Sequence, residues 1–109
     1  MAETQNTLYL VFLNVMPGKE AQFASWYAEH VKQVLEIEGF ESARRMFRTE
    51  IDGRPSPEFA YLGAYEIAGD PSVAFERMKE ARESGKLTPP DPEVVEFPFS
   101  GMVYSTLAE

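Results

Sequence analysis

The most constraining feature of this sequence is the run Leu8 to Val15 (LYLVFLNV), which is apolar at every position except Asn14. Branched and aromatic residues dominate the run, and its length suits a β-strand. A strand without polar alternation is buried on both faces, so it lies inside a sheet rather than on its edge. Met16, Pro17 and Gly18 end the run. The chain must therefore build a sheet with both faces covered.

The hydrophobic period changes after this strand. From Lys19 to about Glu36 the apolar residues recur at spacings of three and four, which predicts an amphipathic helix. Pro17 is compatible with the first helical turn, and Gly39 is a natural stop because glycine accepts the left-handed conformation. The residues on the inward side are Phe23, Trp26, Tyr27, His30, Val31, Val34 and Leu35.

Two further strands are predicted at Phe40 to Ile51 and at Phe59 to Ile67. Asp52-Gly53 marks a turn between them, and the following Arg54 to Pro57 makes this connection longer than two residues. The residues expected on one face of the later strand are Phe59, Tyr61, Tyr65 and Ile67.

Asp70-Pro71 is typical of an N-cap followed by proline at the first helical position, and it predicts a second helix to about Ser84. Gly85 ends this helix. Lys86 to Glu96 contains three prolines and predicts a rigid, extended connector. Phe97 to Leu107 is then the last strand.

The predicted order is β-α-β-β-α-β. Right-handed crossovers place both helices on one face of a four-stranded antiparallel sheet, which is an α+β, ferredoxin-like fold. The length of 109 residues suits one domain, and we see no internal boundary, so residues 1–109 are expected to form a single domain.

Two helices cover only one face of this sheet. In the first strand Leu8, Leu10 and Phe12 point to one face, and Tyr9, Val11, Leu13 and Val15 point to the other. An uncovered apolar face is rare in monomers, so we expect a homodimer that pairs two sheets face to face. The alternative is that the proline-containing connector covers the second face.

Charge and composition exclude several functions. The formal charge is 10 − 18 = −8, which argues against binding to nucleic acid and to anionic membranes. The sequence has no cysteine, which excludes thiolate chemistry, and its single histidine argues against a zinc site, so we expect neither metal nor cofactor. Met1 to Thr7 has no signal-peptide pattern and no segment is long enough to span a membrane, so a cytoplasmic location is expected.

Three stretches carry a resemblance to known proteins: Trp26-Tyr27-Ala28-Glu29-His30-Val31, Ile37-Glu38-Gly39-Phe40 and Ser42-Ala43-Arg44-Arg45. With the predicted element order, they resemble the dimeric α/β-barrel superfamily, most closely its EthD-like proteins. Those proteins place a WY-x-x-H stretch on the first helix and a G-F turn before the second strand. The resemblance implies a pocket between the sheet and the helices of each subunit, and a barrel formed by the two sheets of a dimer.

The superfamily includes cofactor-independent monooxygenases, polyketide cyclases, lactone isomerases, dehydratases and haem enzymes, so the fold does not identify the reaction. Haem ligation by His30 is disfavoured because the haem-binding members are usually larger chains.

His30 is the strongest candidate site residue. It shares the inward side of its helix with Tyr27 and Val34, so it is expected to face the sheet. A neutral imidazole beside a pocket can transfer a proton near neutral pH, which makes His30 the candidate general acid/base. The alternative is a histidine at the margin of the core that makes one hydrogen bond.

The other candidates surround the same expected pocket. Tyr27 and Asn14 are expected to polarise a substrate carbonyl or phenol, although Asn14 could instead satisfy backbone groups at the end of its strand. The expected substrate-binding residues are Trp26, Tyr61, Tyr65, Arg44, Phe75 and Met78. For the aromatic residues the alternative is plain core packing.

Arg44 and Arg45 point to opposite faces of their strand, so at most one reaches the pocket. We name Arg44 as the candidate that holds a carboxylate or enolate. The alternative is pairing with a cross-strand acid such as Glu66 or Glu50.

The resulting hypothesis is a cofactor-independent enzyme that performs proton-transfer chemistry on a small apolar, aromatic or cyclic metabolite. Isomerisation, cyclisation, dehydration and lyase chemistry are all compatible with one histidine, and aromatic compound catabolism is a suitable context. The alternatives are a non-catalytic small-molecule-binding or accessory protein, and a cofactor-independent monooxygenase.

Overall fold

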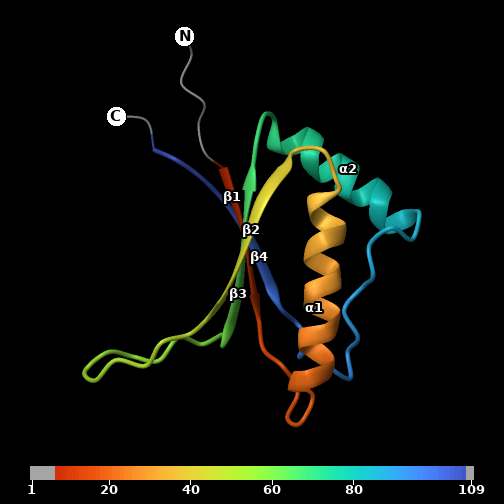
Figure 1. The fold of residues 1–109 in the computed structure, drawn as a ribbon. Coiled ribbons are helices and arrows are strands. Elements are labelled where there is room, and N and C mark those ends of the chain that lie inside the picture. Colours follow the sequence, from red (N-terminus) through yellow and green to blue (C-terminus); the bar gives the residue numbers. More distant parts are fainter. Residues whose placement is uncertain (1–6, 108–109) are drawn as a thin grey trace.

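The structure is a computed structural model that describes residues 7–107 of the chain. Its elements follow the predicted order β-α-β-β-α-β (Figure 1). They are β1 (Thr7–Leu13), α1 (Glu20–Leu35), β2 (Phe40–Phe47), β3 (Tyr61–Ile67), α2 (Pro71–Glu83) and β4 (Ser100–Ser105). The prediction for the stretch Met1 to Thr7 lies, apart from Thr7, outside the described residues.

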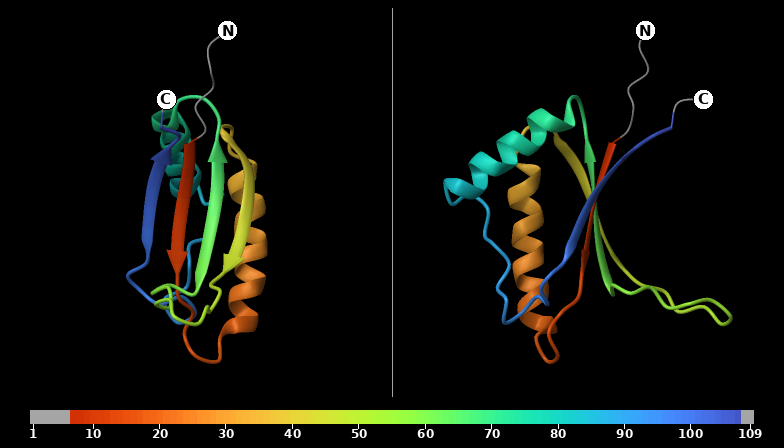
Figure 2. Two further views of the ribbon diagram at one scale, coloured as in Figure 1. Left: turned by 90° about the vertical axis from the view of Figure 1, so that its left-hand side faces the viewer. Right: turned by 180° about the vertical axis from the view of Figure 1, so that it is seen from behind.

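The four strands form one sheet in the order β2-β3-β1-β4, and all neighbours are antiparallel. β1 has a partner on each side, as expected for a strand inside the sheet. Both helices pack on one face, while the other face is turned to the viewer in the left-hand view of Figure 2. This arrangement confirms the α+β, ferredoxin-like fold class.

The core lies between the helices and one sheet face. The helices contribute the buried residues Phe23, Tyr27, Val34, Ala74, Met78 and Ala81. α1 ends at Leu35 with Glu36 as its C-cap, so it stops before Gly39, which the sequence suggested as the stop. Gly39 has a φ of 108°, and a Cβ atom there would lie 3.0 Å from the Cβ of Ala74, so this glycine allows α2 to pack closely. Neither helix within residues 7–107 is long and apolar enough to cross a membrane.

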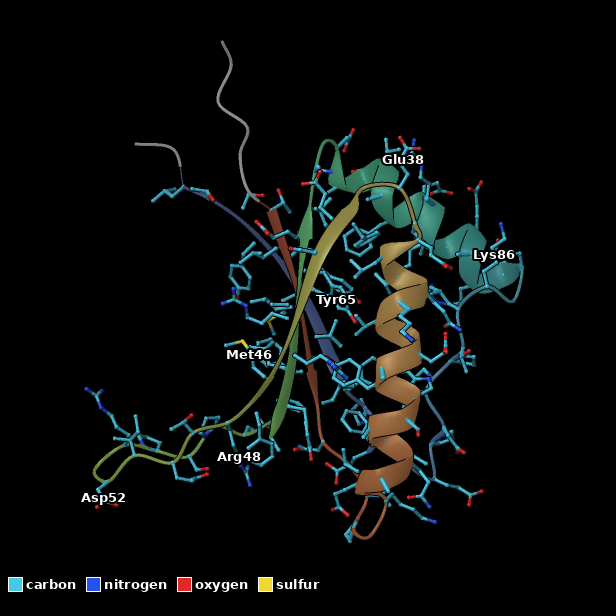
Figure 3. The ribbon with its side chains drawn as sticks, viewed as in Figure 1. Glu38, Met46, Arg48, Asp52, Tyr65 and Lys86 are labelled. Carbon is cyan, nitrogen blue, oxygen red and sulfur yellow. The ribbon has the colours of Figure 1, made fainter. Side chains whose placement is uncertain are left out.

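β2 and β3 are shorter than predicted, because residues 48–60, hereafter the arm, leave the sheet. The arm projects beyond the sheet on the side away from the helices (Figure 1), with the predicted turn at Asp52 near its tip (Figure 3). Phe59 belongs to the arm and contacts Phe12, with ring centroids 6.0 Å apart. Phe12 points away from the helices, whereas Tyr61 points toward them, so the prediction that Phe59 and Tyr61 share a face is wrong. β3 begins only at Tyr61, so strand alternation does not extend back to Phe59.

Residues 86–99, hereafter the connector, run on the helix side of the sheet (Figure 1). Leu87 and Val95 are buried in the helix-side core, and the Met16 amide donates a hydrogen bond to the Val94 carbonyl oxygen at 2.8 Å. The alternative that the connector covers the second sheet face is therefore wrong. β4 begins after Pro98 rather than at Phe97, because proline has no amide hydrogen for the strand ladder.

The second sheet face, hereafter the open face, is rich in apolar side chains, and neither helix nor the connector covers it. Strand register and alternation place on it Leu8, Leu10, Phe12, Arg44, Met46, Leu62, Ala64, Met102 and Tyr104. Met46, Met102 and Tyr104 are 45%, 45% and 57% exposed. Figure 3 shows Met46 on this side and Tyr65 on the helix side.

Candidate functional site

The side of α1 that faces the connector carries the site. Trp26 and His30 are four residues apart on the helix, so their side chains neighbour each other. Their rings stack with centroids 4.6 Å apart and an interplanar angle of 23°. Tyr27, one position further round the helix, is buried against the sheet. Helical spacing therefore places an indole, a phenol and an imidazole beside one another.

Thr88 of the connector is bound to α1 by four hydrogen bonds, hereafter the Thr88 clasp. Trp26 Nε1 donates to the Thr88 carbonyl oxygen at 3.0 Å, and His30 Nδ1 lies 3.2 Å from the same oxygen. Gln33 Nε2 donates to Thr88 Oγ1 at 3.0 Å, and the Thr88 amide donates to Gln33 Oε1 at 2.8 Å. The clasp holds the connector against α1 beside Trp26 and His30.

The contact with Thr88 determines which tautomer His30 adopts. A carbonyl oxygen can only accept, so Nδ1 of His30 carries the hydrogen and donates it. In the neutral ring Nε2 then holds a free lone pair. Burial lowers the pKa of His30, the hydrogen bond to Thr88 raises it, and the charge of Arg82 lowers it. The net pKa is below the usual value, so the ring is neutral at pH 7.

A cavity of about 160 Å³ lies between α1, the sheet, the connector and the end of α2. An apolar cavity of about 150 Å³ accommodates a benzene ring, so this one has room for a single small ring. Its lining residues are Tyr9, Val11, Leu13, Trp26, Tyr27, His30, Val34, Tyr65, Met78, Arg82, Leu87, Thr88, Pro89, Pro90 and Phe99.

Three tyrosines line this cavity with neutral hydroxyl groups. Burial raises the pKa of Tyr27 to about 12 against the opposing effect of Arg45, and it also raises the pKa values of Tyr65 and Tyr9. The Tyr27 hydroxyl is buried and has no hydrogen-bond partner in the described structure. A buried donor without a partner costs about 1–3 kcal/mol of stability, so the Tyr27 hydroxyl is an unsatisfied donor on the sheet side of the cavity.

Gly63 on β3 makes room for the Tyr27 hydroxyl. A Cβ atom at position 63 would overlap this oxygen. On β2, the guanidinium carbon of Arg45 lies 5.8 Å from the centroid of the Tyr27 ring. The sheet therefore fixes the position of the phenol through a glycine below it and a cation beside it.

Five of the predicted site residues meet at the cavity, namely His30, Trp26, Tyr27, Tyr65 and Met78. Arg44 does not, because register pairs it with Ala64 on the open face, whereas Arg45 shares the helix side with Gly63. Arg44 is therefore not a residue of this cavity, and Arg45, although on the helix side, is not among the lining residues either.

Asn14, Tyr61 and Phe75 also lie outside the cavity lining. Asn14 Oδ1 accepts from the Ala60 amide at 2.9 Å, and Nδ2 donates to the Glu58 carbonyl oxygen at 3.4 Å, so this amide secures the base of the arm. Tyr61 packs on Phe23, and Phe75 packs edge-on against Tyr9, with ring centroids 4.7 and 4.8 Å apart.

Sequence reasoning missed Tyr9, Arg82 and Thr88. Arg82 follows Met78 at helical spacing, so it could have been found. Strand alternation groups Tyr9 with Val11 and Leu13, but it does not say which of the two faces meets the helices. Thr88 could not, because its position depends on the path of the connector. The described residues contain no group of three or more His, Cys, Asp or Glu side chains suited to a metal ion.

No family model matches the chain, and no curated protein resembles it in sequence. Solved structures do resemble it in shape. A proposed monooxygenase from Shewanella loihica PV-4 superposes with a TM-score of 0.68 at 8% identity, covering 99% of this chain and 100% of that one. A DABB family protein with a ferredoxin-like fold from Mesorhizobium loti gives 0.59 at 15% identity, covering 97% and 100%.

An EthD family protein from Bacillus halodurans C-125 gives a TM-score of 0.50 at 16% identity, covering 94% of this chain and 99% of that one. This chain shares their fold. The similarity confirms the ferredoxin-like fold that the resemblance implied. Identities this low do not transfer an activity.

Proposed function

We propose that the cavity binds a small, ring-containing, largely apolar metabolite and that His30 transfers a proton to or from it without a cofactor. The observation that carries the proposal is the bond from His30 Nδ1 to the Thr88 carbonyl oxygen at the wall of the cavity. It leaves Nε2 of a neutral imidazole as the only basic nitrogen of the ring. A base of this kind suits proton abstraction next to a carbonyl group.

The proposed reaction uses three side chains of α1 together, those of His30, Tyr27 and Trp26. Nε2 of His30 removes a proton from the carbon beside a substrate carbonyl, and the electron pair of that C–H bond moves toward the carbonyl oxygen. The Tyr27 hydroxyl, which lacks a partner, donates a hydrogen bond to the resulting enolate. The imidazolium keeps its bond to Thr88 and returns the proton to a different atom. Trp26 forms the wall against which the ring packs.

This proton abstraction is common to isomerases, cyclases, dehydratases and lyases. The residues of the site support the abstraction itself and do not favour one of these four enzyme classes. A non-catalytic binding protein is the alternative that the apolar cavity lining supports. Oxygen insertion by a cofactor-independent monooxygenase is supported only by the name of one structural neighbour. A role in aromatic compound catabolism and a cytoplasmic location stay predictions from the sequence.

We also propose that a second copy of the chain covers the open face. Two sheets paired in this way would bury Met46, Met102 and Tyr104, all of which are more than two-fifths exposed in one chain. The arm projects on the same side of the sheet, where it would extend along the partner copy (Figure 1).

Hydrogen exchange into a carbonyl compound tests the catalytic proposal without knowledge of the product. Phenylacetaldehyde and cyclohexanone would be incubated in D₂O with the wild-type chain, and deuterium at the carbon beside the carbonyl would be followed by NMR. The wild type should accelerate exchange, and His30→Gln should abolish the acceleration, because glutamine can donate to Thr88 but has no basic nitrogen.

Glu29→Gln is the matched control, since this neighbouring side chain is exposed and lies outside the cavity. It should exchange at the wild-type rate. Equal exchange rates for the wild type and His30→Gln would contradict catalysis by His30 and leave the binding alternative.

A further inference from the structure

The charged side chain at the cavity is basic, although the chain as a whole is acidic. The protein carries 18 acidic and 10 basic residues, yet no carboxylate is among the cavity-lining residues within positions 7–107. Arg82 is the one lining residue with a permanent positive charge. An acidic protein has therefore placed a cation at its largely apolar cavity.

Arg82 forms no ion pair with an acidic side chain of residues 7–107. The ion pairs within the described residues are Arg48 with Glu50 and Arg77 with Glu38, and neither includes Arg82. Its neighbours along α2 at helical spacing are Lys79 and Met78, and Lys86 follows just beyond the helix. The Arg82 guanidinium therefore has no ion-pair partner within residues 7–107 and is available to a ligand.

Arg82 and Tyr27 both line the cavity but differ strongly in burial. Arg82 is an exposed residue at the last turn of α2, whereas the Tyr27 hydroxyl is fully buried over the sheet. His30 lies between them in burial, and the charge of Arg82 acts on both His30 and Tyr9. A bound molecule would hold its charged end at Arg82 and its ring beside Trp26 and His30.

We propose that the natural ligand is a small monocyclic carboxylic acid whose carboxylate binds to Arg82 and whose ring fills the cavity beside His30. The cavity volume of about 160 Å³ limits the apolar part to one ring. A guanidinium group binds a carboxylate through two parallel hydrogen bonds, which fixes the direction in which the ligand enters. This inference names the ligand class for the proposed function and rests on that proposal.

The competing explanation is that Arg82 only stabilises the C-terminal end of α2, where a positive charge interacts favourably with the helix dipole. This role would not distinguish between ligands. The two explanations therefore separate in a binding experiment that compares an acid with its neutral analogue.

The probes are benzoate and benzamide, which share the ring and differ in charge. Their dissociation constants would be measured from the fluorescence of Trp26, the single tryptophan, which lines the cavity. We expect the wild type to bind benzoate about tenfold or more tightly than benzamide, and Arg82→Gln to lose about tenfold for benzoate alone. Lys79→Gln, the matched control outside the cavity lining, should keep both affinities.

Equal binding of the two probes by the wild type, equal losses for both in Arg82→Gln, or no binding of benzoate at millimolar concentration would overturn the proposal. The His30→Gln variant distinguishes this proposal about the ligand from the proposal that His30 is the catalytic base. If His30→Gln binds benzoate normally but has lost deuterium exchange, both proposals stand. If benzamide binds as well as benzoate while exchange still depends on His30, only the acid specificity fails.

Discussion

His30 is the one imidazole of the chain, and its surroundings decide which nitrogen can react. The Thr88 carbonyl oxygen accepts the hydrogen on Nδ1, and burial disfavours the charged ring. The same two contacts would suit a purely structural histidine. What distinguishes His30 is that its ring also lines a cavity with an unpartnered hydroxyl, that of Tyr27.

The lowered pKa of His30 has a consequence for stability. Because the unfolded chain binds the proton at a higher pH than the folded chain, the contribution of His30 is complete above pH 6.5 and is lost as the pH falls toward the folded pKa. We expect the wild type to lose more unfolding free energy than His30→Gln between pH 7 and about pH 5.5. Urea unfolding at several pH values measures this, and parallel curves for the two proteins would argue against a depressed pKa.

Gly63 and Tyr27 should be strongly coupled. Gly63→Ala places a methyl group onto the Tyr27 hydroxyl and should destabilise the protein by about 1–3 kcal/mol. Tyr27→Phe alone should be neutral or slightly stabilising, because it removes a buried group without a partner. The double variant should recover most of the loss, since the nearest remaining ring carbon lies 3.3 Å from the new Cβ position.

A double-mutant cycle by chemical denaturation measures this coupling. Additive effects of the two substitutions would show that the hydroxyl does not rest on Gly63.

At the scale of elements, the predicted order and the buried side of α1 agree with the structure for definite reasons. The helical spacing of Phe23, Tyr27 and Val34 reports which side of α1 is buried, and Asp70 caps α2 by accepting from the Ser72 amide at 2.9 Å. The arm and the exact start of β4 were not predictable in this way. The Arg48 amide still donates to the Ala60 carbonyl oxygen at 2.8 Å, so the pairing of the strands fades gradually into the arm. Pro55 and Pro57 further out cannot donate to a strand ladder.

The candidate site was also predictable only in part. Residues on α1 were identified because helical spacing reports the inward side directly. Arg44 was favoured over Arg45 although alternation alone cannot say which strand face meets the helices. Thr88 contributes through its backbone carbonyl oxygen, which every residue possesses, so no side-chain pattern marks it.

The Thr88 clasp is the element that closes the cavity. Gln33→Ala removes both of its side-chain hydrogen bonds to Thr88 and should cost about 0.5–1.5 kcal/mol locally. We expect faster hydrogen exchange at the Thr88 amide, measured by NMR. Gln22→Ala, an exposed position near the start of α1, is the control and should leave that amide unchanged. Unchanged exchange in Gln33→Ala would mean that the connector is held without the clasp.

At the scale of the whole molecule, the fold leaves one sheet face for a partner. Met102 on the open face and Val73 on α2 are similarly exposed, at 45% and 42%, but lie on opposite sides of the sheet. If two copies pair through the open face, Met102→Asp should produce monomers by burying a charge, whereas Val73→Asp should remain dimeric. Sedimentation equilibrium measures the mass, and a monomeric wild type would refute the dimer.

The most direct test of the site is the tautomer of its single histidine. In ¹⁵N-labelled protein at pH 7.5, the imidazole contributes one pair of nitrogen signals, free of overlap from any other histidine. We predict a protonated Nδ1 and an unprotonated Nε2, and a shift of the Nε2 signal when benzoate is added. A hydrogen on Nε2, or a ring that titrates at the ordinary pKa of about 6.5 and ignores benzoate, would contradict the assignment of His30 as the base of this cavity.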